Sequence, residues 1–182
     1  FGKGRTGNYQ LLKDVADSYH YRLREIPAHV LDSISVSSTR IREAIAGGDM
    51  ETANMLLGYI YFFSGTVVQG NKLGRTIGFP TANLQATDSF KLMPADGVYA
   101  VDAIVDDEPQ KRLKAMMNIG YRPTVDGSKK VIEVNIFNFD RTIYGKTIKV
   151  FVKRFLRGER RFSGLEELKA QLDADREEAK LI

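Results

Sequence analysis

The chain has 182 residues, of which 43% are hydrophobic and 27% are charged, and its net charge is +4 at pH 7. This composition excludes an intrinsically disordered chain and supplies enough apolar surface for a core. With no cysteine and two histidines, at positions 20 and 29, the sequence excludes disulfides and a typical zinc site, so a bound metal should be an oxygen-liganded cation such as Mg²⁺.

The net positive charge predicts an anionic partner, either a nucleotide or a nucleic acid. No segment approaches the roughly 18 consecutive apolar residues of a membrane-spanning helix. The first ten residues, FGKGRTGNYQ, also lack the apolar core of a signal peptide. We therefore expect a cytoplasmic protein without a membrane partner.

Residues 37–58 are predicted to form two short helices in tandem. Ser38 is suited to cap the first helix, and the glycine pair at 47–48 ends it. Asp49 caps the second helix, METANMLL, and Gly58 ends it. The sequence changes character after this helix, and we expect a domain boundary there.

From Tyr59 onward the sequence predicts a series of β-strands. Five segments rich in β-branched and aromatic residues are separated by Gly, Pro or Asp. They are YIYFFSGTVVQ (59–69), GVYAVDAIV (97–105), RLKAMMNIG (112–120), VIEVNIFNF (131–139) and IKVFVKRFL (148–156). Because no helix intervenes, we expect an antiparallel sheet that curls into a small barrel and so removes its edges.

One helix is predicted at the C-terminal end, in SGLEELKAQLDADREEAK. Ser163 and Glu166 are suited to form a capping box at its start. An apolar stripe follows one face, and we expect it to pack against the barrel. Its members are Leu165, Leu168, Leu172 and Ala179.

Glycines and basic residues gather in the loop that follows the first strand. Gly70, Gly74 and Gly78 permit positive φ, with which backbone N–H groups can converge on an anion. Lys72 and Arg75 add positive charge. These residues suit a phosphate-binding loop.

The segment PTAN ends this loop. Pro80 fixes its own φ, and Thr81 and Asn83, at i and i+2, share a face if the chain continues as a strand. A hydroxyl and an amide oxygen suit Mg²⁺, which completes its octahedron with phosphate oxygens and water. A glycine hairpin with a Thr–Asn turn cap explains the same residues, and local physics does not decide between the two interpretations.

Strand 131–139 places Glu133 on the face opposite Ile132 and Val134. A glutamate in such a position is usually a solvated surface residue. Its functional interpretation is a general base, which needs a substrate hydroxyl within hydrogen-bond reach. Spacing along the strand leaves both interpretations open.

Residues 146–161 contain seven Lys or Arg residues and one glutamate. Such a run is usually the solvated face of a strand and loop, but it also suits a phosphate or nucleic-acid patch. The neighbouring Phe151, Phe155 and Phe162 suit either core packing or stacking on a planar ring.

Together, five segments resemble the riboflavin kinase module of bacterial bifunctional riboflavin kinase/FAD synthetases. They are GTVVQGNKLGRTIGFPTANL, GVYAV, NIGYRPT, EVNIFNFDRTIYGKTIKV and FLRGERRFSGLEELKAQLDAD. Upstream, FGKGRTGNYQLL and SVSSTRIREAIAGGD resemble the tail of the same family's FMN adenylyltransferase module. The resemblance implies that residues 1–57 are a C-terminal fragment of that module and that residues 58–182 form a riboflavin kinase domain.

The implied fold is mainly β. It is a small six-stranded antiparallel, Greek-key-like barrel with a C-terminal helix, preceded by a helical remnant of an α/β nucleotidyltransferase domain. The implied enzyme transfers the γ-phosphoryl group of ATP to the 5'-hydroxyl of riboflavin and uses Mg²⁺. Its expected partners are the small molecules riboflavin, FMN, ATP and ADP, with no nucleic acid.

The resemblance also implies roles for individual residues. Glu133 is expected to act as the base, and Thr81 and Asn83 to meet the magnesium ion and the phosphates. Further ATP or phosphate contacts are expected at Gly70, Lys72, Gly74, Arg75, Gly78 and Pro80. Flavin contacts are expected at Asn118, Arg157, Glu159 and Phe162.

One departure from the family concerns FAD synthesis. The adenylyltransferase half of the family carries an H-x-G-H motif, which this sequence lacks. We therefore expect no FMN adenylyltransferase activity from this chain. Two alternatives stay open: a basic β-barrel that binds RNA by stacking and phosphate contacts, and a flavin-binding module without catalysis.

Overall fold

The computed structural model describes residues 4, 6–23, 30–31, 34–70, 73–124 and 127–182. The chain divides into two compact units, Phe1–Val36 and Ser37–Ile182. The first unit contains helix α1 (Tyr9–Ala16) and a short antiparallel pair, β1 (Val30–Leu31) and β2 (Ile34–Ser35). Asn8 caps α1 by accepting a hydrogen bond from the Leu11 backbone N–H.

The second unit begins with the two predicted helices, α2 (Ser38–Gly47) and α3 (Met50–Leu57). Ser37, rather than Ser38, caps α2 by accepting from the Arg40 N–H. Asp49 caps α3 as predicted, and glycines with positive φ end both helices. The predicted domain boundary at residue 57/58 stays a prediction, because contacts within the fold do not show which residues derive from the same ancestral domain.

Asn54 fixes α3 to the strands that follow it. Its side-chain amide donates to the carbonyl oxygens of Val152, at 3.0 Å, and Lys153, at 3.2 Å. Its carbonyl oxygen accepts from the Tyr61 N–H at 2.7 Å. One partly buried side chain therefore satisfies three backbone groups that α3 would otherwise cover and leave unpaired.

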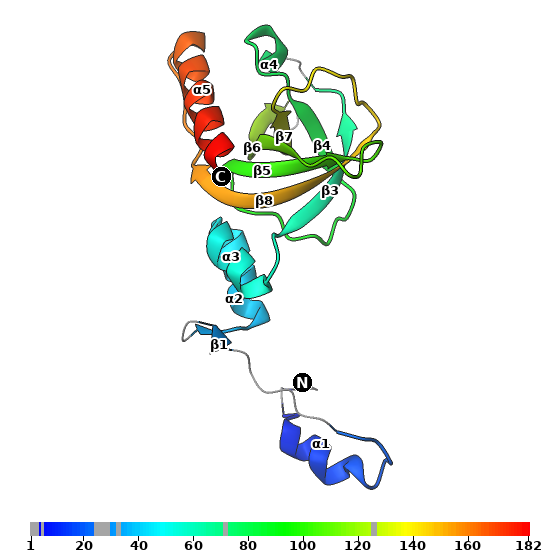
Figure 1. Cartoon of the computed structure of the whole chain (residues 1–182). Helices are drawn as coiled ribbons and strands as arrows, with labels where there is room; N and C mark the ends of the chain where they lie inside the picture. The colour runs from blue at the N-terminus through cyan, green and yellow to red at the C-terminus, as the bar shows by residue number, and fades with distance from the viewer. Residues whose placement is uncertain (1–3, 5, 24–29, 32–33, 71–72, 125–126) are drawn as a thin grey trace. The chain divides into compact units, whose positions relative to one another are not determined.

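Six antiparallel strands close into a barrel in the order β3-β4-β7-β6-β5-β8 (Figure 1). This confirms the mainly β, six-stranded fold. The strands are β3 (Phe62–Val68), β4 (Ala82–Ala86), β5 (Gly97–Val105), β6 (Leu113–Thr124), β7 (Gly127–Ile136) and β8 (Thr147–Arg157). The strand missing from the sequence-based series is β4, which starts directly after Thr81. A four-residue helix, α4 (Leu73–Thr76), lies in the loop between β3 and β4.

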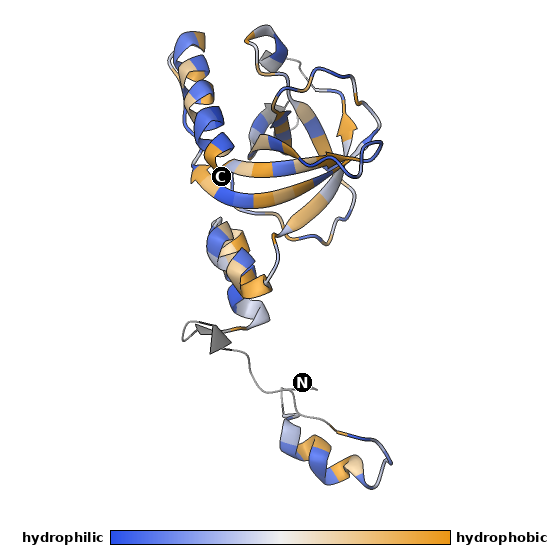
Figure 2. Cartoon of the chain, viewed as in Figure 1, coloured by the Kyte–Doolittle hydropathy of each residue, from blue (hydrophilic) through white to orange (hydrophobic). Residues whose placement is uncertain are grey.

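Alternating side chains fill the barrel. Along β7, Ile132, Val134 and Ile136 are buried in the main apolar cluster, which also takes residues from all five other strands. Figure 2 shows the same alternation of apolar and polar positions along the strands. Because successive side chains on a strand point to opposite faces, Glu133 and Asn135 must lie outside the barrel.

Helix α5 (Leu165–Leu181) covers part of the outer surface of the barrel (Figure 1). Leu172 and Ala179 from the predicted stripe join a second apolar cluster that includes Ala100 and Met116 of the barrel. Leu165 does not take part, since it is 56% exposed. None of the described helices is long and apolar enough to cross a membrane.

The cap of α5 differs from the prediction by one residue. The helix starts after Gly164, so the third helical position is Glu167 rather than Glu166. The Glu167 carboxylate accepts from the Ser163 backbone N–H, at 2.9 Å, and from the Ser163 hydroxyl, at 2.8 Å. These bonds, together with Arg160, lower the pKa of Glu167 to about 2.

We predict that Asn54→Ala lowers the free energy of unfolding by about 1 to 3 kcal/mol, because three backbone groups lose their partner. Glu51→Ala on the same helix should change it by less than about 1 kcal/mol, since the pair between Glu51 and Arg154 is exposed and 3.7 Å apart. Urea denaturation followed by circular dichroism measures both. Equal losses in the two variants would contradict the role of Asn54.

We also predict a loss of stability in alkali. Burial raises the pKa of Tyr61 and of Tyr99 to about 12, whereas an unfolded tyrosine ionises near about 10. The two tyrosines therefore make their full contribution to the free energy of unfolding below about pH 10. This contribution is lost as the pH rises toward about 12. Urea midpoints at a series of alkaline pH values measure it, and the Tyr61→Phe/Tyr99→Phe variant should show a shallower decline. An unchanged decline would refute the assignment.

Candidate active site

Three polar side chains form a row across the outside of the barrel. In the strand register, Glu133 of β7 lies opposite Asn83 of β4 on one side and opposite Asn118 of β6 on the other. All three belong to the outward-facing set, because their sequence neighbours Leu84, Ile132 and Val134 point into the core. A carboxylate is thus flanked by two amides.

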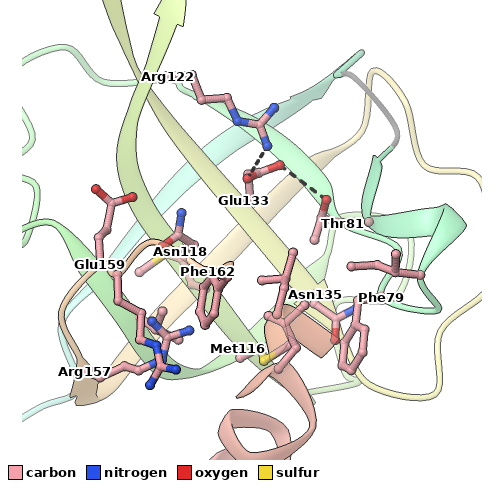
Figure 3. Close-up of a pocket in the computed structure, with 17 residues that line it drawn as sticks. Phe79, Thr81, Met116, Asn118, Arg122, Glu133, Asn135, Arg157, Glu159 and Phe162 are labelled. Carbon is pink, nitrogen blue, oxygen red and sulfur yellow. Dashed lines mark hydrogen bonds and ion pairs between the residues drawn. The ribbon is translucent and has the colours of Figure 1, made fainter. Parts of the chain in front are cut away.

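A cavity of about 230 Å³ lies over the Glu133 and Asn118 end of this row, between the barrel, α5 and the segment that joins β8 to α5 (Figure 3). Its walls combine apolar side chains with a few charged and polar ones, as expected for a small-molecule site. The lining residues that matter below are Thr81, Asn118, Arg122, Glu133, Arg157, Glu159 and Phe162.

Glu133 makes two different contacts in this cavity. Its Oε2 atom is paired with Arg122 Nη2 at 2.5 Å. Its Oε1 atom lies 3.5 Å from the Thr81 hydroxyl, the outer limit of a hydrogen bond. Figure 3 shows the three side chains in one line, with Glu133 in the middle. One carboxylate oxygen is therefore held by a cation, while the other is only loosely engaged.

A second cavity, of about 420 Å³, adjoins the first at Thr81. Arg75, Pro80 and Thr81 line it on one side, and Arg141 and Tyr144 belong to its other wall. Thr81 lines both cavities. The two cavities therefore share the residue whose hydroxyl lies beside Glu133.

The PTAN loop is held in place from β7. Asn135, which is 6% exposed, donates its side-chain amide to the Pro80 carbonyl at 2.7 Å. Glu133 and Asn135 are at i and i+2 on one strand, so they share a face. A single strand therefore carries the carboxylate and also fixes the backbone next to Thr81.

The glycines of this loop serve close approaches more than positive φ. Only Gly78 among Gly70, Gly74 and Gly78 has positive φ, at +85°. A Cβ at Gly70 would lie 2.2 Å from the Asn83 side-chain nitrogen, and one at Gly74 would lie 2.3 Å from the Phe79 carbonyl oxygen. The expected nest of three positive-φ glycines is therefore wrong.

The other residues predicted at the site fall into three groups. Thr81 and Glu133 lie together, and the four residues predicted at the flavin, Asn118, Arg157, Glu159 and Phe162, all line the first cavity with Gly74. Arg75 and Pro80 line the second cavity. Asn83 lines neither of these cavities, and its side chain packs against Gly70. Gly78 lines a third, separate cavity. Lys72 lies outside the described residues.

The segment after β8 forms the far wall of the first cavity. Two guanidinium groups lie near the Phe162 ring, those of Arg160, at 4.8 Å from its centroid, and Arg157, at 5.8 Å. The Glu159 carboxylate lies against Gly120, where a Cβ would come within 1.8 Å of it. Only glycine at position 120 leaves room for Glu159 in this position.

Asp175 of α5 fixes Arg157 in this wall. Arg157 Nε lies 2.9 Å from Asp175 Oδ1 and Nη2 lies 2.6 Å from Oδ2, and Gln171 donates to the same carboxylate at 2.8 Å. The Asp175 side chain is only 3% exposed. A buried carboxylate with these partners orients the guanidinium and joins α5 to β8.

Three residues of the site were missed by sequence analysis. Arg122 had a usable signal, because positions 118, 120 and 122 of β6 share the outward face. Asn135 had the same signal relative to Glu133. Asp175 had none, since its partner Arg157 is on another element.

A comparison with family models matches residues 57–182 to the riboflavin kinase family (Flavokinase). The bifunctional riboflavin kinase/FMN adenylyltransferase of Escherichia coli (strain K12) is 39% identical over 175 residues, which are 96% of this chain and 55% of that protein. The protein of the same name from Bacillus subtilis (strain 168) is 45% identical over 147 residues, which are 79% of this chain and 45% of that protein. The chain thus spans about half the length of the curated relatives it matches.

A crystal structure of a protein called a macrolide-efflux protein, from Streptococcus pneumoniae, is similar in fold. It superimposes with a TM-score of 0.83 at 39% identity and covers 92% of this chain and 54% of the other.

We predict that Asp175→Ala lowers the free energy of unfolding by about 3 kcal/mol, because it breaks a buried pair and leaves Arg157 without its partner. Asp173→Ala, two residues earlier on α5, should cost less than about 1 kcal/mol, since Asp173 is 45% exposed and pairs with the exposed Arg176. Urea denaturation of both variants measures the difference. A loss for Asp175→Ala no larger than that for Asp173→Ala would show that the pair does not hold α5 in place.

Proposed function

Because the chain belongs to the riboflavin kinase family, we propose that it transfers the γ-phosphoryl group of ATP to the 5'-hydroxyl of riboflavin and so makes FMN. One observation of the site carries this proposal. Two cavities meet at Thr81, and the Glu133 carboxylate lies 3.5 Å from its hydroxyl at that junction. A group that passes between ligands in the two cavities would pass near Thr81, the residue common to both linings, whose hydroxyl lies beside Glu133.

The first cavity suits the flavin. It offers an aromatic ring at Phe162, apolar side chains such as Met116 and Leu168, and the amide of Asn118 for a polar ring edge. The second cavity suits the nucleotide, because Arg75 supplies positive charge for its phosphates and Arg141, which pairs with Glu108 at 2.9 Å, also lines it. All four predicted flavin residues line the first cavity, whereas of the predicted phosphate residues Arg75 and Pro80 line the second and Gly74 lines the first.

Glu133 is suited to accept the proton of the 5'-hydroxyl. Its Oε2 is already bound by Arg122, so Oε1, which faces Thr81, is the atom available for the proton. A positioned base contributes about 10²- to 10⁴-fold in rate. Phosphoryl transfer otherwise depends on alignment and charge neutralisation, which the fixed PTAN loop and the neighbouring arginines supply.

A magnesium ion fits the donor set at the junction. The described residues contain no cluster of three or more His, Cys, Asp or Glu side chains that could hold a metal by themselves. The hydroxyl of Thr81 and the amide oxygen of Asn83 instead resemble the few protein ligands of a Mg²⁺ that is bound mainly by phosphate and water. When bound there, the ion would neutralise phosphate charge. Asn83 packs against Gly70, so its side chain would have to turn toward Thr81 to take part.

The alternative of an RNA-binding barrel has less support. Five of the seven cations between residues 146 and 161 are paired with carboxylates of this chain: Lys146 with Asp107, Lys153 with Asp102, Arg154 with Glu51, Arg157 with Asp175 and Arg160 with Glu167. Cations paired in this way form no open stripe for a nucleic-acid backbone. The alternative of a flavin-binding module without catalysis gives no role to the second cavity, which adjoins the first at Thr81.

We further propose that FMN, rather than FAD, is the product, because the sequence lacks the H-x-G-H motif of the family's adenylyltransferase half. Incubation with riboflavin, ATP and Mg²⁺, followed by chromatography, distinguishes the two flavin products. Absence of FMN would contradict the proposed function, and appearance of FAD would contradict only the limit on the product.

We predict that Glu133→Gln lowers kcat by about 10²- to 10⁴-fold with little change in stability, because the amide keeps the shape of the side chain but cannot accept the proton. Glu166→Gln removes an exposed carboxylate of α5 and serves as the control. FMN formation at saturating substrates measures kcat. If Glu133→Gln stays within about threefold of the wild type, Glu133 is not the base.

A further inference from the structure

We propose that Arg122 is a catalytic residue that binds the oxygen atoms of the phosphoryl group during its transfer. This inference rests on the proposed function and assigns to the site a residue that the sequence analysis left without a role. It starts from the position of Arg122 in the first cavity, where it pairs with the Glu133 carboxylate beside Thr81.

Arg122 reaches the junction from β6. Asn118, Gly120 and Arg122 lie at alternate positions of this strand, with Ile119 buried in the core between them, so they share the outward face. The side chain of Arg122 is 35% exposed and lines the first cavity. It approaches Glu133 from the side opposite Thr81 (Figure 3).

The guanidinium group has donors to spare. It carries five N–H donors in one plane, and the single contact recorded for it among the described residues uses Nη2. The same group can therefore hold Glu133 Oε2 and still present other N–H donors to a phosphoryl oxygen. A lysine at this position would offer one ammonium group and no such planar, two-sided arrangement.

The transfer itself explains why a cation is needed here. The 5'-hydroxyl oxygen forms a bond to the γ-phosphorus as the bond from phosphorus to the β–γ bridging oxygen breaks, and the electron pair leaves with ADP. The hydroxyl proton passes to Glu133 Oε1. With the entering and leaving oxygens in line, the three other oxygens of the phosphoryl group point sideways and carry negative charge. Arg122 is bound to the carboxylate that would accept the proton, so its guanidinium group would lie close to these oxygens.

A purely structural role for the ion pair is weaker. Arg122 is 35% exposed, so water screens its end of the pair and limits what the pair contributes to stability. A second alternative is that Arg122 acts only by orienting Glu133. The two roles differ in one measurable respect, because an orienting role disappears once Glu133 can no longer act as the base.

A double-mutant cycle separates them. Arg122→Ala, Glu133→Gln and the double variant are compared with the wild type by single-turnover FMN formation. We expect Arg122→Ala to lose about 10²- to 10³-fold in rate, with riboflavin binding within about threefold of the wild type. In the Glu133→Gln background we expect a further loss of at least about tenfold. No further loss in that background would overturn the proposal, since Arg122 would then act through Glu133 alone.

Two variants and one addition complete the test. Lys130→Ala on β7 removes a cation of matched exposure, 37%, that pairs with Asp96, and it should keep the wild-type rate. Arg122→Lys should retain only part of the activity and guards against a folding defect in Arg122→Ala. Added guanidinium ion should restore part of the rate of Arg122→Ala and none of that of Glu133→Gln.

The outcomes also separate this proposal from the proposed function. If the wild type makes no FMN, the proposed function fails and the role of Arg122 fails with it. If the wild type makes FMN and Arg122→Ala makes it at the same rate, only the role of Arg122 is refuted.

Discussion

The antiparallel register of β4, β7 and β6 is the constraint on which the site depends. It sets Asn83, Glu133 and Asn118 in one row on the outside of the barrel. A slip of one residue in β7 would turn Glu133 into the core and Val134 outward, which the tightly filled interior prevents. The packing of the core therefore fixes where the carboxylate points.

The same strand also sets the distance between the carboxylate and the PTAN loop. Asn135 holds the Pro80 carbonyl, and Glu133 lies two residues before it. Because both positions belong to one rigid strand, Thr81 and Glu133 cannot move apart without breaking a buried hydrogen bond. Placement of these groups on a strand, with the loop tied to it, suits the proposed phosphoryl transfer, since the rate of such a reaction depends on alignment.

The other side of the cavity depends on a helix that comes last in the chain. Helix α5 packs on the barrel through Leu172 and Ala179, and Asp175 holds Arg157 from it. The wall of the cavity is therefore built by two elements joined through a buried ion pair. Other cations of this region are also paired with carboxylates of the chain, among them Lys153, Arg154 and Arg160.

The sequence by itself determined the elements and the chemistry of several residues, because alternation, capping residues and turn residues act over a few positions. It predicted the strands that begin at Tyr59, the caps at Asp49 and Gly58, and the outward face of Glu133. It left open whether Thr81 and Glu133 meet, and it misjudged the reason for Gly70 and Gly74. Tertiary structure decided these points, together with the contacts of Arg122, Asn135 and Asp175, because each depends on pairing between segments distant in sequence, and such pairing follows from register and packing rather than local pattern.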